Sequence, residues 1–198
     1  MSAKGLFVVL DGIDGTGKTT LSKCLEKQLS SLGYKVFLTA EPTSGTIGSI
    51  LRNTDIGDSK AEALMFVADR ALHTKEMISR VDDGEIVICD RYYASTLAYQ
   101  SSQLDDTAVD IEWLKQINDG VIVEPDLTFI LDLDPEEASE RVDNRGERSR
   151  FERLEYQKRV RDCYLRIAKE RNFIITDASL PAEQVCSEVL AKITDKLR

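Results

Sequence analysis

The sequence predicts an α/β fold in three layers, with a five-stranded parallel sheet between layers of helices. Short apolar runs alternate along the chain with segments in which apolar residues recur at helical spacing. The runs are almost continuously apolar, which is typical of strands buried on both faces of a parallel sheet. Connections in such a sheet are right-handed, and ligands bind at the carboxyl ends of its strands.

The elements follow one another in a regular order. The expected strands are Gly5–Leu10, Lys35–Ala40, Glu85–Cys89, Leu127–Leu133 and Phe173–Thr176. The first helix has a leucine stripe that ends at Gly33, and Asp134 and Pro135 provide a cap and a first turn for another. The expected helical segments are 21–32, 61–81, 111–117, 134–142, 160–167 and 180–193.

Length and composition indicate one domain over residues 1–198, without a membrane span. Apolar residues make up 42% of the 198 residues, but no apolar run approaches the roughly 20 that a spanning helix needs. No signal peptide is recognisable, so we expect a cytoplasmic protein. The net charge of −9 argues against nucleic acid as a partner, because proteins that bind duplexes carry basic faces.

The cysteines and the single histidine do not form a recognisable metal or redox motif. Cys24, Cys89, Cys163 and Cys186 are far apart, so we expect four reduced thiols, buried or partly buried. His73 cannot make a zinc site alone, and we expect it at a helix surface or in a crevice.

A glycine-rich segment between the first strand and the first helix predicts a nucleoside triphosphate site. Its sequence, GIDGTGKT, fits the phosphate-binding pattern G-x-x-x-x-G-K-[ST]. Backbone N–H groups at a helix N-terminus face the phosphates, the lysine reaches the β- and γ-phosphates, and the threonine binds Mg²⁺. The expected ATP-binding residues here are Gly12, Ile13, Asp14, Gly15, Thr16, Gly17, Lys18 and Thr19.

A second acidic site is expected where the third strand ends. Asp90 follows the apolar run EIVIC and is a reasonable second ligand for Mg²⁺. Arg91 comes next and could hold a second phosphate, whereas a pure hydrolase has no need of it. The guanine-reading pattern N-K-x-D is missing from the sequence, which makes a phosphate-loop switch a weaker alternative than a kinase.

The motifs resemble those of the thymidylate kinase family over essentially the whole chain. The matching stretches are DGIDGTGKTT, EPTSGTIGSILR, ALMFVADR, DRYYASTLAYQ and RGERSRFE, in the family's order and spacing. The variants EPT…IG…LR and ADRALH in this sequence are similar to those of archaeal members of the family. The resemblance implies the phosphate-loop NTPase fold with a mobile lid, and transfer of the γ-phosphoryl group of ATP to dTMP with Mg²⁺ as cofactor.

The resemblance also implies an acceptor site. Asp14 would face the 3′-hydroxyl of dTMP, Phe66 would stack on the base, and Tyr99 would crowd the 2′ position. Glu41 and Pro42 begin the acceptor-side loop, where several relatives carry an arginine, so a direct role for Glu41 is doubtful. The implied dTMP-binding residues are Asp14, Arg52, Phe66, Arg70, Arg91, Ser95, Thr96, Tyr99 and Gln100.

An arginine-rich segment, approximately 141–153, matches the family's lid over ATP. The phosphate loop lacks an arginine at its variable positions, so the lid must supply the catalytic one. Arg150 aligns best and Arg145 lies close to it, whereas the role of Arg148 is open. Together with Lys18 and Arg91, these two arginines are the expected catalytic residues, and Arg141 is expected to bind ATP.

Three alternatives to dTMP phosphorylation remain from the sequence. A deoxynucleoside kinase typically carries E-R-S where this chain has Asp90-Arg91-Tyr92, and it would need a general base. A kinase of UMP, CMP or AMP is disfavoured by Tyr99 and by the pair Phe66 and Arg70. A switch or partner-binding protein would lack the acceptor motifs. The family usually forms homodimers, so we expect a homodimer with ATP and dTMP as ligands.

Overall fold

The sheet has five parallel strands, as the sequence predicts, and the structure gives their order as β2-β3-β1-β4-β5. The computed structural model describes residues 5–103, 108–142 and 147–198, with only the helical backbone for 147–152. Each strand lies within one residue of its predicted boundaries. The strands are β1 (Leu6–Asp11), β2 (Val36–Ala40), β3 (Ile86–Asp90), β4 (Leu127–Asp132) and β5 (Ile174–Asp177).

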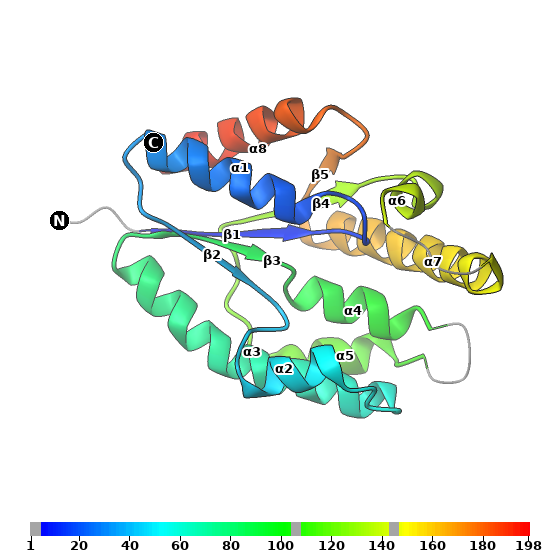
Figure 1. The fold of residues 1–198 in the computed structure, drawn as a ribbon. Helices are drawn as coiled ribbons and strands as arrows, with labels where there is room; N and C mark the ends of the chain where they lie inside the picture. The colour runs from blue at the N-terminus through cyan, green and yellow to red at the C-terminus, as the bar shows by residue number, and fades with distance from the viewer. Residues whose placement is uncertain (1–4, 104–107, 143–146) are drawn as a thin grey trace.

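Helices cover both faces of the sheet and give the three layers (Figure 1). α1 and α8 pack side by side on one face, while α3, α4, α5 and α7 form the layer on the other. The helices are α1 (Lys18–Ser31), α2 (Thr46–Asn53), α3 (Ser59–Asp82), α4 (Tyr93–Ser101), α5 (Ile111–Asn118), α6 (Pro135–Arg141), α7 (Glu147–Arg171) and α8 (Ala182–Leu197).

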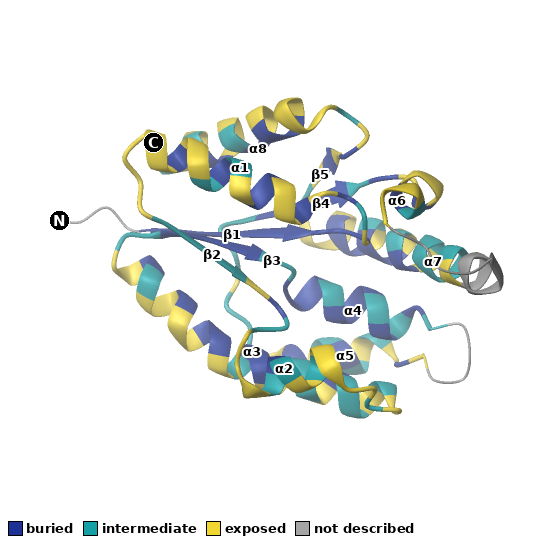
Figure 2. Cartoon of the chain, in the orientation of Figure 1, coloured by how far each residue is buried: buried dark blue, intermediate teal, exposed yellow. Residues whose placement is uncertain are grey.

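The centre of the core is β1, in which every residue is buried (Figure 2). Its apolar side chains pack against helices on both faces, so that Val8 and Leu10 are fully buried. Continuous burial explains why the run LFVVL lacks the alternating pattern of a half-exposed strand. Because β1 lies between β3 and β4, the carboxyl ends of these three strands meet at one edge.

Two helices have no counterpart among the predicted segments. α4 is buried on nearly every side, so its sequence YASTLAYQS shows no apolar stripe with a polar opposite face. α2 is short and contains Gly48, a weak helix former. Both helices carry predicted acceptor-site residues, so tertiary packing rather than local periodicity positions part of the site.

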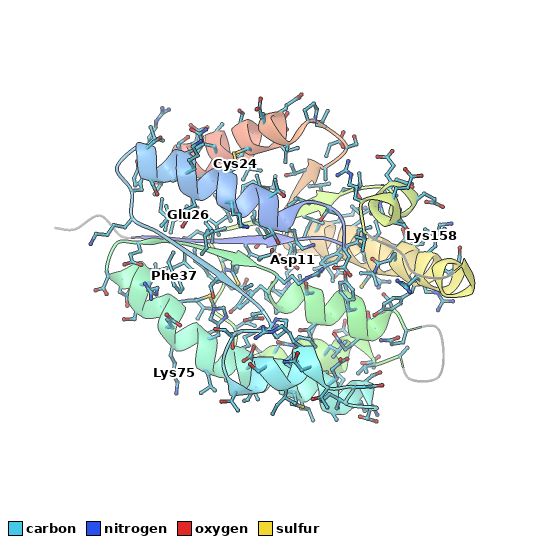
Figure 3. All side chains as sticks on the ribbon, in the orientation of Figure 1. Asp11, Cys24, Glu26, Phe37, Lys75 and Lys158 are labelled. Atoms are coloured by element: carbon cyan, nitrogen blue, oxygen red, sulfur yellow. A yellow bond between two sulfur atoms is a disulfide. The ribbon has the colours of Figure 1, made fainter. Side chains whose placement is uncertain are left out.

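The expectation of four reduced cysteines is wrong for one pair. Cys24 of α1 and Cys186 of α8 form a disulfide, with Cα atoms 6.4 Å apart (Figure 3 labels Cys24). They are 162 residues apart in the sequence, and only the packing of α1 against α8 brings them together. Cys89 and Cys163 are buried free thiols, as expected.

Of the two places predicted for His73, the structure shows the crevice rather than the helix surface, because the residue is buried and lines a cavity. Its Nε2 lies 2.7 Å from Thr39 Oγ1 on β2, and its Nδ1 lies 3.1 Å from Glu41 Oε1. α3 packs against the sheet along this side, which turns a helix position into a core position. None of the helices in the described ranges is long and apolar enough to cross a membrane.

Candidate active site

The phosphate loop connects β1 to α1 and requires glycine at two close backbone approaches. Gly12 has a φ of 139°, and a Cβ there would lie 2.5 Å from the carbonyl oxygen of Leu131. Gly15 has a φ of 85°, and a Cβ there would lie 2.3 Å from the carbonyl oxygen of Ala138. Glycine therefore lets the loop wrap closely against β4 and α6.

Lys18 is the first residue of α1, and its ammonium group lies inside the loop. Nζ donates to the carbonyl oxygens of Gly12 at 3.0 Å and Ile13 at 2.8 Å. Burial lowers the pKa of Lys18 to about 8, and the nearby charge of Arg91 adds to this effect. The side chain of Ile13 is buried, so this residue can meet a ligand only through its backbone.

Two oxygen-bearing side chains stand beside the loop in a pattern that suits a divalent cation. Thr19 Oγ1 donates to Asp90 Oδ2 at 2.8 Å, which brings the start of α1 to the carboxyl end of β3. A hydroxyl and a carboxylate are hard oxygen donors, the type that Mg²⁺ prefers. The two predicted metal-binding residues are therefore next to each other and fit the ion's chemistry.

A cavity of about 980 Å³ opens beside the phosphate loop. Its walls include the loop from Asp14 to Thr19, the carboxyl end of β3, and the segment 178–183 that leads into α8. Arg141 lines this cavity too, and its Nη1 donates to the carbonyl oxygen of Ala178 at 3.1 Å. The cavity is large enough for a nucleotide, and the phosphate loop forms part of its wall.

A second cavity, of about 340 Å³, lies on the other side of Asp14 and Arg91, and both residues also line the first cavity. The second cavity, called the acceptor cavity below, collects most of the predicted dTMP-binding residues. Its lining residues are Asp14, Glu41, Pro42, Glu62, Phe66, Arg70, Arg91, Tyr92, Ser95, Thr96, Tyr99, Gln100, Gln103 and Tyr156.

Arg91 is fixed at the junction of the two cavities by several hydrogen bonds. Its Nη2 lies 2.5 Å from Asp14 Oδ1 and 3.3 Å from the Tyr99 hydroxyl, and its Nη1 donates to Ser95 Oγ at 3.2 Å. Its φ of 72° is rare for a residue with a side chain. Such backbone strain persists only where surrounding contacts impose it, and it concentrates at functional sites.

Asp11 is fully buried at the carboxyl end of β1 (Figure 3), and Ser95 connects it to Arg91. Its Oδ1 accepts hydrogen bonds from Ser95 Oγ at 2.6 Å and from the Tyr164 hydroxyl at 3.0 Å. Burial raises the pKa of Asp11 to about 6, although the hydrogen bond from Ser95 opposes the rise. Through Ser95, Asp11 connects the phosphate loop to α4, and through Tyr164 it connects the loop to α7.

Arg70 is almost fully buried at the base of the acceptor cavity and is held by three partners. Nε and Nη2 donate to Glu41 Oε2 at 2.9 and 2.6 Å, Nη2 donates to Thr96 Oγ1 at 3.0 Å, and Nη1 donates to Asn118 Oδ1 at 2.5 Å. Glu41, whose direct role the sequence left doubtful, therefore acts on Arg70.

Arg52 is the one predicted dTMP-binding residue that does not line the acceptor cavity. It lies on α2 beside a third cavity, and its Nη1 donates to the carbonyl oxygen of Pro42. Its role in binding phosphate stays a prediction.

Comparison with known proteins identifies the family. The family profile described as thymidylate kinase matches residues 10–189, which is most of the chain. The chain belongs to the thymidylate kinase family. It is 38% identical over 206 residues to the probable thymidylate kinase of Pyrococcus horikoshii, and the alignment covers 98% of each protein. It is also 38% identical to the thymidylate kinase of Halothermothrix orenii, with 96% and 97% covered, and 39% identical to the probable thymidylate kinase of Pyrobaculum aerophilum, with 97% and 98% covered.

The segment predicted as the lid, approximately 141–153, includes the start of α7 and the residues before it. Arg145 lies outside the described residues, and Arg148 and Arg150 belong to the part of α7 of which the structure gives only the backbone. Further along α7, the Tyr156 hydroxyl donates to the carbonyl oxygen of Tyr99 at 2.8 Å. The described part of α7 is therefore joined to the acceptor cavity.

Sequence reasoning missed several residues of this family site. Tyr156 and Tyr164 carry no motif signal, and Asp11 begins the motif DGIDGTGKTT without being singled out, because the role of each depends on contacts between distant elements. Glu62 did leave a signal: it precedes Phe66 and Arg70 at steps of four residues, which places all three on one face of a helix.

Proposed function

We propose that this chain is a thymidylate kinase that transfers the γ-phosphoryl group of ATP to dTMP and forms ADP and dTDP. The observation that carries the proposal is the pair of cavities that meet at Asp14 and Arg91. One cavity lies beside the phosphate loop, and the other is lined by aromatic and polar side chains that suit a nucleotide base. A kinase needs such a junction, because donor and acceptor phosphates must come into line.

ATP would occupy the larger cavity. The N–H groups of the loop from Gly12 to Gly17 would hold its β-phosphate, and Lys18 would turn from the loop carbonyl oxygens to the phosphates. Arg141 lines the wall near residues 178–183 and would contact the nucleoside part. The lowered pKa of Lys18 should return toward its usual value when phosphate oxygens surround the ammonium group.

Thr19 and Asp90 would hold Mg²⁺ together with the phosphates. Their hydrogen bond of 2.8 Å keeps both oxygen atoms close enough to bind one ion. The ion neutralises charge on the β- and γ-phosphates when bound.

dTMP would bind in the acceptor cavity with its phosphate toward Arg91. Phe66 would cover the base, Arg70 and Gln100 would contact its edge, and Tyr99 would lie near the sugar. When the phosphate pairs with Arg91, Asp14 is released from its ion pair and can accept a hydrogen bond from the 3′-hydroxyl. The remaining predicted contacts, from Ser95 and Thr96, already position Arg91 and Arg70.

A dTMP phosphate oxygen attacks the γ-phosphorus in line, and the bond from that phosphorus to the β-bridging oxygen breaks as ADP leaves. The nucleophile is already an anion, so the reaction requires no general base. The chain's contribution is alignment and neutralisation of charge by Lys18, Arg91 and a lid arginine, Arg150 or Arg145. Closure of the lid excludes water, which would otherwise hydrolyse ATP.

We further propose one catalytic domain over residues 1–198, with a mobile lid at about 141–153, and a homodimer. An apolar strip on α3 supports the homodimer, since Leu64 is 50% exposed and Leu72 is 62% exposed. Large exposed aliphatic side chains on one helix are typical of surfaces that another protein covers. The cytoplasmic location stays a prediction.

A coupled assay of ADP release tests the proposal with ATP, Mg²⁺ and a panel of acceptors. We expect the fastest turnover with dTMP, little with UMP, CMP or AMP, and none with thymidine. Turnover with thymidine would indicate a deoxynucleoside kinase, and steady ATP hydrolysis without an acceptor would indicate a switch or ATPase. Either result would overturn the proposal.

A further inference from the structure

Gln100 lines the acceptor cavity, and only the nitrogen of its side-chain amide is hydrogen-bonded within the described residues. The side chain is 5% exposed, and its Nε2 donates to Glu62 Oε2 at 3.1 Å. Its Oε1 is buried and has no hydrogen-bond partner within the described residues. A buried carbonyl oxygen without a partner is costly, which suggests that a ligand completes it.

Glu62 determines which half of the amide remains open. An ionised carboxylate only accepts hydrogen bonds, so the amide nitrogen of Gln100 must turn toward it. Glu62 lies in the first turn of α3, where the helix dipole favours a negative charge. If the carboxylate were absent, the amide could rotate by half a turn and present N–H groups instead of oxygen.

Arg70 provides a complementary donor in the same cavity. A guanidinium group carries five N–H donors. Four hydrogen bonds use them: two to Glu41, one to Thr96 and one to Asn118. One Nη1 hydrogen therefore has no partner among the described residues. The cavity thus offers one acceptor, Gln100 Oε1, and one donor, Arg70 Nη1.

We infer that Glu62 is a positioning residue for base specificity. It holds the amide of Gln100 with the oxygen facing the base. The site thereby selects a pyrimidine that carries an N–H next to a carbonyl group. The inference rests on the proposed function. Thymine presents N3–H as a donor and O4 as an acceptor, which match Gln100 and Arg70. Cytosine presents an acceptor at N3 and an amino donor at C4, so both hydrogen bonds fail. Uracil has the same edge as thymine and is not distinguished by this contact.

The geometry of α3 supports a role in the site. Glu62, Phe66 and Arg70 lie four residues apart, on one face of the helix, and all three line the cavity. The same face therefore supplies the ring over the base, the donor for its carbonyl and the carboxylate that orients the acceptor. Since Glu62 acts on the base by orienting Gln100, its effect on base preference should depend on that side chain.

The test compares kcat and KM for dTMP and dCMP, at saturating ATP, in the wild type and in Glu62→Gln. The replacement keeps the side chain's shape but allows the Gln100 amide to rotate. We expect KM for dTMP to rise about tenfold with kcat little changed, and the preference for dTMP over dCMP to fall at least about tenfold. Glu62→Asp retains a group that only accepts, so we expect it to keep most of the preference, and it also serves if the glutamine variant does not fold.

Two further variants separate specificity from structure. Glu76→Gln removes a carboxylate on the same helix that pairs with Arg80 outside the site, and it should leave the preference unchanged. In a Gln100→Ala background, Glu62→Gln should produce no further loss of preference. An unchanged preference in Glu62→Gln, or an equal loss in the Gln100→Ala background, would overturn the inference. A wild-type protein that does not phosphorylate dTMP would instead overturn the proposed function, and the inference with it.

Discussion

At the scale of single residues, the ion pair between Asp14 and Arg91 is the centre of the site. The two side chains lie 2.5 Å apart at the junction of the two cavities. An acid inside a phosphate loop is unfavourable for the phosphates, but here it faces an arginine that belongs to the acceptor side. The pair therefore keeps Arg91 oriented, and a bound acceptor phosphate would replace Asp14.

Replacement of Asp14 by asparagine should weaken dTMP binding while sparing ATP. The variant loses a charged acceptor for the 3′-hydroxyl, which corresponds to roughly tenfold or more in Kd. Isothermal titration with each nucleotide measures both affinities, and Asp195→Asn, at an exposed pair near the C-terminus, is the matched control. If both affinities fall equally, Asp14 serves the loop rather than the acceptor.

Asp11 should make stability depend on pH. Its folded pKa of about 6 lies above the ordinary value of 3.8, so the native state binds the proton more tightly than the unfolded chain. The resulting stability is present below pH 3.8 and is lost as pH rises through about 6. Two pKa units correspond to about 3 kcal/mol.

Asp11→Asn removes this titration. Relative to the wild type, its free energy of unfolding should therefore rise between about pH 4 and pH 7, by up to about 3 kcal/mol. Urea denaturation at several pH values measures the difference. Two stability curves that stay parallel over this range would show that Asp11 has an ordinary pKa.

Residues in a contiguous motif were predictable from the sequence, whereas residues joined by tertiary contacts were not. Gly12 to Thr19 are neighbours in the chain, and their chemistry follows from local spacing. Glu41 reaches Arg70 across 29 positions, and Asp11 reaches Tyr164 across 153, so neither contact has a local signature. Family resemblance supplied most of the residues that line the acceptor cavity, but it left out those that hold them in place.

At the scale of elements, α7 is joined to the site by its middle, and its first residues belong to the segment predicted as the lid. Tyr156 bonds to the backbone of Tyr99 at 2.8 Å, and Tyr164 bonds to Asp11 at 3.0 Å. These two contacts fix the middle of the helix against α4 and β1. The periodic helices and the buried strands were predictable, but α2 and α4 were not, because packing rather than periodicity defines them.

Arg150→Ala should lower kcat on the order of 10³-fold with little change in either KM, because a lid arginine neutralises charge that develops only during transfer. Steady-state kinetics with ATP and dTMP measures the effect. Arg171→Ala, at the far end of the same helix, is the matched control. A loss below tenfold in Arg150→Ala would assign the catalytic role to Arg145 or Arg148.

At the scale of the whole molecule, the sheet order brings the phosphate loop, Asp90 and Arg91 to one edge. β1 and β3 are neighbours although 74 residues lie between the last residue of β1 and the first residue of β3. Their parallel pairing puts Leu10 beside Asp90. The sequence predicted parallel strands with ligands at their carboxyl ends, but it did not predict which strands are neighbours, because pairing depends on tertiary packing. The disulfide between α1 and α8 could not be predicted, since nothing local relates Cys24 to Cys186.

The disulfide should contribute measurably to stability. It closes a loop of 162 residues, and cross-links of that kind stabilise proteins by about 2–5 kcal/mol, mainly through the unfolded chain. We expect the double variant Cys24→Ser, Cys186→Ser to unfold at lower urea concentration than the wild type. Dithiothreitol should destabilise the wild type to the same level and leave the double variant unchanged, and equal midpoints for all would argue against the bond.

The measurement that tests the central claim most directly is titration with a ligand that joins adenosine and thymidine, 5′ to 5′, through a polyphosphate chain. If the two cavities form one site for phosphoryl transfer, one molecule per chain should displace both ATP and dTMP and bind more tightly than either. Displacement of ATP alone, with dTMP still bound, would show that the two cavities do not meet at Asp14 and Arg91 and would contradict the account.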